Sequence, residues 1–144
     1  EKFLDESLKI LNLALPFNKD FSGILNSIYS VSQKTGVSLG AFSLQIGSLS
    51  DSEKKDDFST ISLSIPINAN VLAVNRFVET INKTVPLSEV TLIKIGSLTS
   101  TIGLSFYYKP LGFSSYEEDA RIEPLTQKGL TVINQLNGFE NILP

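Results

Sequence analysis

The sequence predicts an α+β domain in which a four-stranded antiparallel sheet carries two helices on one face. The first observation is a repeat, because one helix-like segment followed by two strand-like segments occurs in residues 19–65 and again in residues 71–109. The second observation is that core positions of the two helices match at a constant offset of fifty residues: Phe21 with Val71, Ile24 with Val74, Ile28 with Val78, and Val31 with Ile81. Two helix–strand–strand units placed side by side form a circularly permuted ferredoxin-like sandwich.

Each unit begins with a helix that has recognisable ends. The first helix is expected over residues 19–35, with Asn18 as its N-cap, because a side-chain oxygen there can accept a hydrogen bond from the first turn. The second helix is expected to begin after Asn68 or Asn70. Pro86 has no amide hydrogen and is expected to stop this helix.

Two strand-like segments follow each helix. In the first unit, residues 37–46 change the phase of their alternation at Gly40-Ala41, which predicts a bulge or bend there. Residues 58–65 then alternate cleanly, as a half-buried strand does. The second unit has the same plan, with its phase change between Leu92 and Ile93.

A short motif occurs twice, as LNLALPFN at residues 11–18 and as ISLSIPIN at residues 61–68. If both copies were strands, residues 11–15 and residues 101–109 would compete for one central place in the sheet. The later segment is longer and is joined by a tight turn to its neighbour, so we expect it to take that place. The first copy is then a bridge into the sandwich, and adds at most a short fifth strand.

The chain is expected to divide into three parts. Residues 1–16 form the end of an N-terminal helix or coiled coil and a bridge, residues 17–110 form the sandwich, and residues 111–144 form a linker and a short C-terminal helix. Gly129 and Thr131 weaken that last helix. Its apolar side would carry Leu125, Val132, Ile133 and Leu136. Docking of this helix on the sheet and fraying of the tail are both open alternatives.

The first residues carry an apolar stripe. Leu4, Leu8 and Leu11 recur at helical spacing, with Phe3 beside them. One such repeat fits a globular helix and the last turns of a coiled coil alike. The lack of an N-cap and of a starting Met favours a helix that is already running before Glu1, at the cut edge of a longer chain.

Composition excludes several kinds of chemistry. The 144 residues include no Cys and no His, so a disulfide, a thiolate metal site and a histidine base are impossible. The net charge is −3 and the basic residues are scattered, unlike those of a nucleic-acid-binding surface. The charge cluster at residues 51–57 has two lysines where a calcium loop needs oxygen ligands. We therefore expect no enzymatic activity, no catalytic residue, no metal, no cofactor and no small-molecule substrate.

Taken in order, these segments resemble the PilO family of type IV pilus assembly proteins, and the related GspM proteins of type II secretion. The most specific features are the x-x-Gly-Val-Ser-Leu junction at residues 34–39 and the Ile-x-x-Asn-x-x-x-Val-x-x-Phe-Val pattern at residues 67–78. The resemblance covers residues 1–110, and the C-terminal extension is less typical of the family.

The resemblance implies a non-catalytic structural scaffold of the type IV pilus, or type II secretion-like, inner-membrane assembly complex. Such proteins have one membrane helix and a coiled coil before the sandwich. The resemblance thus places this part of the chain on the extracytoplasmic (periplasmic) side of the bacterial inner membrane, anchored by a single upstream span. They form homodimers, and heterodimers with a PilN-like protein, beside other members of the complex. Leu4, Leu8 and Leu11 would contact a partner or the sandwich itself.

Two further classes of protein stay open. Ferredoxin-like repeats of the ACT type bind small molecules between subunits, and such a regulatory domain would be stabilised by one specific ligand. An RNA-binding sandwich would stack bases on Phe106, Tyr107 and Tyr108, but only Lys109 adjoins them and no nucleic-acid partner is expected. We expect Phe106 and Tyr108 in the core and Tyr107 on the outer face of the sheet.

Overall fold

The computed structural model describes residues 2–41, 43–45, 59–109 and 125–139. The elements in chain order are α1 (Lys2–Ala14), α2 (Phe21–Thr35), β1 (Ser38–Leu39), β2 (Ser43–Gln45), β3 (Ser59–Asn68), α3 (Val71–Ile81), β4 (Ser88–Lys94), β5 (Ser100–Tyr108) and α4 (Gln127–Asn137). The predicted charged loop at 51–57 and most of the predicted linker lie outside the described residues. Within those residues, no helix has the length and apolar character needed to cross a bilayer.

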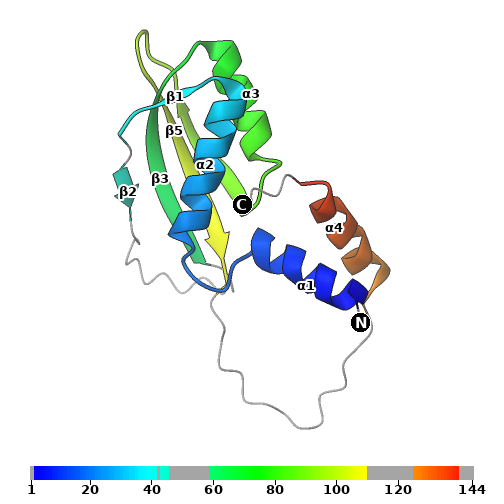
Figure 1. Ribbon diagram of the computed structural model, residues 1–144. Helices are drawn as coiled ribbons and strands as arrows, with labels where there is room; N and C mark the ends of the chain where they lie inside the picture. Colours follow the sequence, from blue (N-terminus) through cyan, green and yellow to red (C-terminus); the bar gives the residue numbers. More distant parts are fainter. Residues whose placement is uncertain (1, 42, 46–58, 110–124, 140–144) are drawn as a thin grey trace.

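The sheet is antiparallel throughout, and its order is β1-β3-β5-β4 with β2 also paired to β3. β1 and β2 follow one another along the same side of β3, so the sheet has four strand positions. α2 and α3 lie side by side over one face of this sheet (Figure 1). The predicted α+β class with a four-stranded antiparallel sheet is confirmed. β5 takes the central place beside β3, as the motif comparison predicted.

Alternation along the strands and helical spacing along α2 and α3 build one core between the two layers. Its buried residues come from both helices and from the helix-facing side of the strands: Ile24, Ile28, Val31, Val37, Ile61, Leu63, Ile65, Ile67, Val74, Phe77, Ile81, Ile102, Leu104 and Phe106. We call this set the sandwich core. Phe106 lies inside it and Tyr108 packs partly against it, as expected.

The helix ends differ from the prediction in two places. The N-cap of α2 is Asp20 and not Asn18, because the Asp20 carboxylate accepts a hydrogen bond from the Gly23 N–H at 2.9 Å. The N-cap of α3 is Asn70, one of the two expected residues. α3 ends at Ile81, well before Pro86, since the chain turns there and carries Val85 away from the helix into a second apolar cluster.

The predicted bend at Gly40-Ala41 separates β1 from β2, and Pro66 explains it. Pro66 lies inside β3 and has no N–H to offer the outer strand, so the ladder loses one hydrogen bond between its β1 and β2 portions. Its carbonyl still accepts a hydrogen bond from the Gly40 N–H at 2.8 Å. A Cβ at Gly40 would lie 3.0 Å from the Pro66 ring, which favours glycine at this close approach.

The predicted phase change in the second unit is a β-bulge in β4. The pairing with β5 shifts between Val90 and Leu92, which leaves Thr91 as the extra residue, slightly earlier than predicted. Gly103 lies opposite on β5, and a Cβ there would meet the Thr91 hydroxyl at 2.9 Å. The small residue and the bulge therefore fit one another.

The repeated motif has two different structures. ISLSIPIN forms most of β3, whereas the first residues of LNLALPFN complete α1. α1 ends at Ala14 and not at the predicted residue 11, because Ala14 is buried and helical packing continues to that point. The bridge that follows is held at the end of the sheet, where the Pro16 carbonyl accepts a hydrogen bond from the Lys109 N–H at 2.9 Å. Residues 11–15 form no strand.

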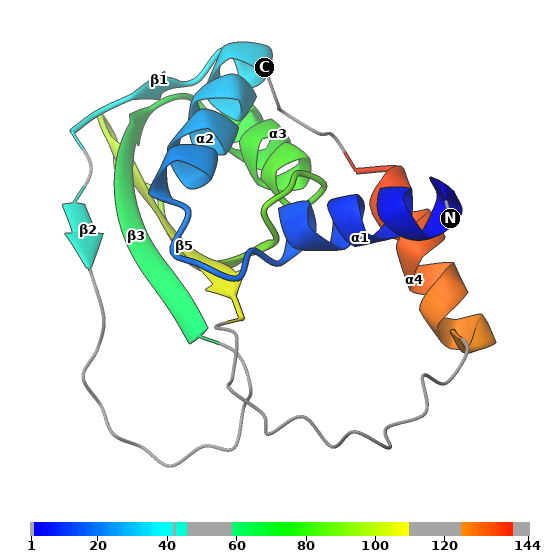
Figure 2. The same ribbon diagram turned by 60° about the horizontal axis from the view of Figure 1, so that its bottom comes forward.

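The C-terminal helix α4 resolves the alternative that the sequence left open for the tail. Thr126 caps its first turn by accepting a hydrogen bond from the Gly129 N–H at 3.2 Å. The helix docks on α1 at one end of the sheet and not on the sheet itself (Figure 2). Its predicted apolar side is divided, since Ile133 and Leu136 are buried while Leu125 and Val132 are exposed.

Candidate interaction surface

α1 and α4 pack around a small apolar cluster at the end of the sandwich. Its buried residues are Ile10, Ala14, Val85, Ile133 and Leu136, with Leu13, Leu87 and Phe139 partly buried against them. We call this set the end cluster. α1 is anchored to the sheet by its Ala14 carbonyl, which accepts a hydrogen bond from the Leu87 N–H at 2.9 Å. The end cluster therefore fixes α1 and α4 to the sandwich.

α1 buries one side and leaves several large apolar side chains exposed. Ser7, Ile10 and Ala14 are buried, and the Ser7 hydroxyl is satisfied by the Phe3 carbonyl at 2.7 Å. Four larger apolar residues of the same helix are exposed: Phe3 at 53%, Leu4 at 54%, Leu8 at 64% and Leu11 at 37%. The predicted stripe of Leu4, Leu8 and Leu11 is thus exposed to solvent.

A groove between α1 and α4 continues this apolar surface. It has a volume of about 340 Å³, and its lining is Leu11, Leu125, Thr126, Lys128, Gly129, Val132 and Ile133. Leu11 belongs both to the groove and to the exposed stripe of α1, so the two join into one surface. We call the stripe and the groove together the α1–α4 surface. A continuous exposed apolar patch of this kind is typical of a protein-binding site.

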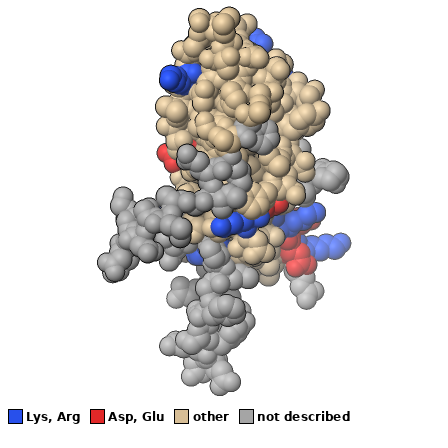
Figure 3. Space-filling model, turned by 90° about the vertical axis from the view of Figure 1, so that its left-hand side faces the viewer, with Lys and Arg blue, Asp and Glu red and all other residues tan. Residues whose placement is uncertain are grey.

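Charged residues lie between the exposed apolar residues of α1. Along α1 the sequence alternates apolar residues with Lys2, Asp5, Glu6 and Lys9. Figure 3 shows one side of the molecule on which Lys, Arg, Asp and Glu are sparse over the sandwich and gather toward the lower end. Charges of both signs around an apolar patch resemble the polar rim of a protein–protein interface.

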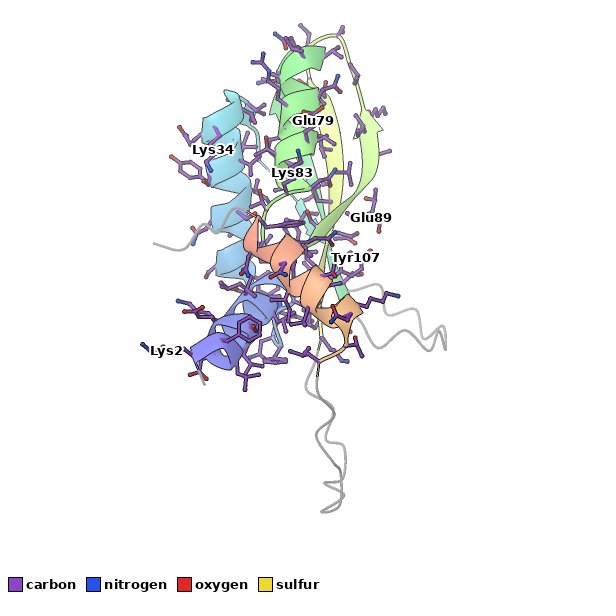
Figure 4. The ribbon with its side chains drawn as sticks, turned by 90° about the vertical axis from the view of Figure 1, so that its right-hand side faces the viewer. Lys2, Lys34, Glu79, Lys83, Glu89 and Tyr107 are labelled. Atoms are coloured by element: carbon purple, nitrogen blue, oxygen red, sulfur yellow. The ribbon has the colours of Figure 1, made fainter. Side chains whose placement is uncertain are left out.

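The outer face of the sheet carries one interacting pair of titratable groups. The Tyr107 hydroxyl on β5 donates a hydrogen bond to the Glu89 carboxylate on β4 at 2.5 Å, and the two side chains point toward one another in Figure 4. This hydrogen bond, together with partial burial and the negative charge of Glu89, raises the pKa of Tyr107 above its usual value. The pair joins two strands and is not an acid–base site facing a cavity.

A second cleft has a different character. It lies where α3 and the end of α4 approach, has a volume of about 250 Å³, and is lined by Glu79, Thr80, Lys83 and Gly138. Across the described ranges, the acidic side chains form no group of three that could hold a metal ion. This cleft is more polar than the groove between α1 and α4.

The sequence located part of the α1–α4 surface. It predicted the stripe of Leu4, Leu8 and Leu11 as a partner-binding feature, and these residues are exposed on one helix. It did not predict that Leu125 and Val132 would extend the same surface, because the packing of α4 on α1 carries no local signal. No family model matches the chain, and no curated protein is significantly similar to it.

Proposed function

We propose that this chain is a non-catalytic scaffold domain of the PilO type. In this proposal it belongs to the inner-membrane assembly complex of a type IV pilus, or of a type II secretion-like machine. It acts by pairing with itself and with a PilN-like protein on the extracytoplasmic side of the bacterial inner membrane. A single membrane span upstream would hold it there.

The observation that carries the proposal is the α1–α4 surface. Burying a Leu side chain contributes roughly 1.5–3 kcal/mol, so Leu4, Leu8 and Leu11 together can drive association with an apolar helix. A partner helix laid along α1 would also fill the groove lined by Leu125 and Val132. A coiled coil that reaches the domain through α1 would make this contact in the manner that the family resemblance implies.

The topology gives independent support. A helix precedes each strand pair, and the strand order β1-β3-β5-β4 is the order that a circularly permuted ferredoxin-like sandwich requires. In such a fold the sheet has helices on one face only, and its other surfaces stay available to partners. A scaffold domain needs these surfaces and needs no active site.

The test uses the full-length protein, co-expressed with a candidate PilN-like protein. We expect the two to co-purify, and Leu8→Glu to weaken the complex by at least about tenfold, because a charge would enter an apolar interface. Leu72→Glu is the matched control, since Leu72 is an equally exposed helix residue at 60% on α3, away from this surface. A gene that encodes no apolar segment of about 20 residues upstream of Glu1 would contradict the proposal, because a membrane-spanning helix needs that length.

The ACT-like alternative has its own readout. A regulatory domain would show a thermal shift of several degrees with one specific amino acid or other small ligand, since a ligand that binds only the folded state stabilises it. A scaffold domain would show none across the same ligand set. A specific shift that persists in Leu8→Glu would favour the regulatory domain over the scaffold.

A further inference from the structure

A second candidate surface is the β4 edge of the sheet. Among the described strands, β4 is last in the order and pairs only with β5. The apolar residues along this edge and its following turn are exposed: Leu92, Ile93, Ile95 and Leu98, the last at 89%. Natural proteins rarely leave an apolar edge strand open, because it invites pairing with another strand.

The bulge at Thr91 decides which residues of β4 share a face. Val90 lies opposite Leu104 and Ile93 lies opposite Ile102, and both partners belong to the sandwich core. Val90 and Ile93 therefore lie on the helix-covered face although they are separated by an odd number of positions.

The two charged residues of β4, Glu89 and Lys94, both lie on the outer face of the sheet, again because of the bulge at Thr91. Glu89 lies opposite Ser105 and Lys94 lies opposite Thr101. Both positions alternate with the core-facing residues of β5, so the carboxylate and the ammonium group stand on the outer face of the sheet.

The residues of β4 whose side chains face the helices direct their backbone N–H and C=O groups to the edge of the sheet. The Leu87 carbonyl accepts a hydrogen bond from the Tyr107 N–H at 3.1 Å, so Leu87 directs its polar groups toward β5. Because this direction alternates along an antiparallel strand, Ser88 and Val90 direct theirs outward. Across the bulge, Ile93 does the same, since it lies opposite Ile102.

We propose that β4 pairs antiparallel with β4 of a second copy of this chain, about a two-fold axis perpendicular to the sheet. Val90 then lies opposite Ile93 of the second copy on the helix-covered face. Glu89 lies opposite Lys94 of the second copy on the outer face. The symmetry repeats each pair, which gives two apolar and two oppositely charged cross-strand pairs.

Only this register of the two β4 strands forms both the apolar pairs and the oppositely charged pairs. A face-preserving shift moves the second strand by two residues, and either shift removes both charged pairs: Glu89 then faces Leu92 or Gly96, and Lys94 faces Leu87 or Thr91. Glu89 is also held in position, because Tyr107 bonds one of its carboxylate oxygens and leaves the other for the incoming ammonium group. The charges therefore oppose pairing with unrelated strands and favour pairing with a second copy.

This inference rests on the proposed function only in expecting the chain to self-associate, and it uses a surface separate from α1 and α4. The experiment measures the self-association constant of the chain by sedimentation velocity over a concentration series. Glu89→Lys and Lys94→Glu each place like charges opposite one another twice. Each is expected to weaken the dimer by about tenfold or more.

The decisive sample is an equimolar mixture of the two single variants. In a mixed pair, the ammonium group that Glu89→Lys introduces faces the carboxylate that Lys94→Glu introduces on the other chain. The unchanged Lys94 of the first variant faces the unchanged Glu89 of the second, so opposite charges meet at both positions. We expect the mixture to restore dimerisation, and the double variant Glu89→Lys/Lys94→Glu to restore it within one kind of chain. Thermal unfolding of each variant shows whether the monomer is folded.

The results of these experiments show whether the β4 edge or the α1–α4 surface holds the dimer. Loss in both single variants with recovery in the mixture supports the β4 pairing. A wild-type chain that stays monomeric, or single variants that dimerise as the wild type does, overturns it. If Leu8→Glu abolishes the dimer while the charge variants leave it intact, the α1–α4 surface holds the dimer, which supports the proposed function and overturns this inference.

Discussion

The sandwich core and the end cluster are built from the same kinds of residue, yet they bury them differently. In the sandwich core, α3 turns Phe77 and Ile81, its largest apolar side chains on that side, against the sheet, and both are almost fully buried. In the end cluster, α1 turns Ser7, Ile10 and Ala14 inward and leaves Leu4 and Leu8 in water. The first region buries the large apolar side chains that face the sheet. The second leaves large apolar side chains exposed, and these form the partner-binding surface that we propose.

The largest effect should come from opening a cavity in the sandwich core. Phe77→Ala removes a ring that is completely buried, so we expect the free energy of unfolding to fall by about 3–5 kcal/mol. Urea denaturation followed by circular dichroism measures this loss. Leu72→Ala on the same helix is 60% exposed and should change stability by no more than about 0.5 kcal/mol. Equal losses in both variants would contradict the burial of Phe77 in the sandwich core.

A smaller and local effect is expected in the end cluster. Ile133→Ala, at a residue 2% exposed, should lower the free energy of local opening of α1 and α4 by about 2 kcal/mol. Hydrogen exchange should show faster exchange in these helices while amides of β3 and β5 keep their protection, because the end cluster can open separately. The neighbouring Val132→Ala, at an exposed position, serves as control. Faster exchange in the sheet as well would show that the two regions unfold together.

Removing one N-cap hydrogen bond should have different effects in the two regions, global in α3 and local in α4. Asn70→Ala removes the acceptor for the Ala73 N–H, 2.8 Å away, and should lower the free energy of global unfolding by about 1 kcal/mol. Thr126→Ala removes the equivalent contact of α4 and should appear only as faster local exchange. Asn75→Ala, an exposed mid-helix residue of α3, controls for the change in helix propensity.

The smallest effect concerns the outer face, away from both clusters. The raised pKa of Tyr107 means that its bond to Glu89 is present below pH 10.0, the usual value for Tyr, and is lost as the pH rises through the higher pKa in the folded state. The difference between the wild-type and Tyr107→Phe titrations, followed by tyrosinate absorbance, should have its midpoint above pH 10.0. A midpoint at or below that value would contradict the Tyr107–Glu89 contact.

The sequence predicted the layers of this fold better than it predicted their ends. Periodicity located α2, α3 and the central strands because those segments bury one face, and burial leaves a regular pattern. The N-cap of α2 was assigned to Asn18 because Asn and Asp are equally good caps, and only the geometry of the first turn selects Asp20.

The candidate surface was predictable only in part, for a physical reason. The spacing of Leu4, Leu8 and Leu11 shows that they share a side of a helix, but spacing alone does not distinguish an inward side from an outward one. Ser7 and Ala14 face the end cluster because small residues let α4 approach closely, and this depends on a contact far along the sequence. The groove and the β4 edge follow from such contacts and not from local pattern.

The proline inside β3 also bears on how far the proposed β4 pairing could extend. In the described residues the outer strand on the Pro66 side is divided into β1 with two residues and β2 with three, while β4 on the other side has seven. In the proposed dimer the β4 edge of each chain is already occupied, so further growth of the sheet would have to use the divided β1–β2 side. Replacing Pro66 would return an amide donor to the interrupted side. The sheet would then have two edges to extend from, and a closed dimer could become an open fibre.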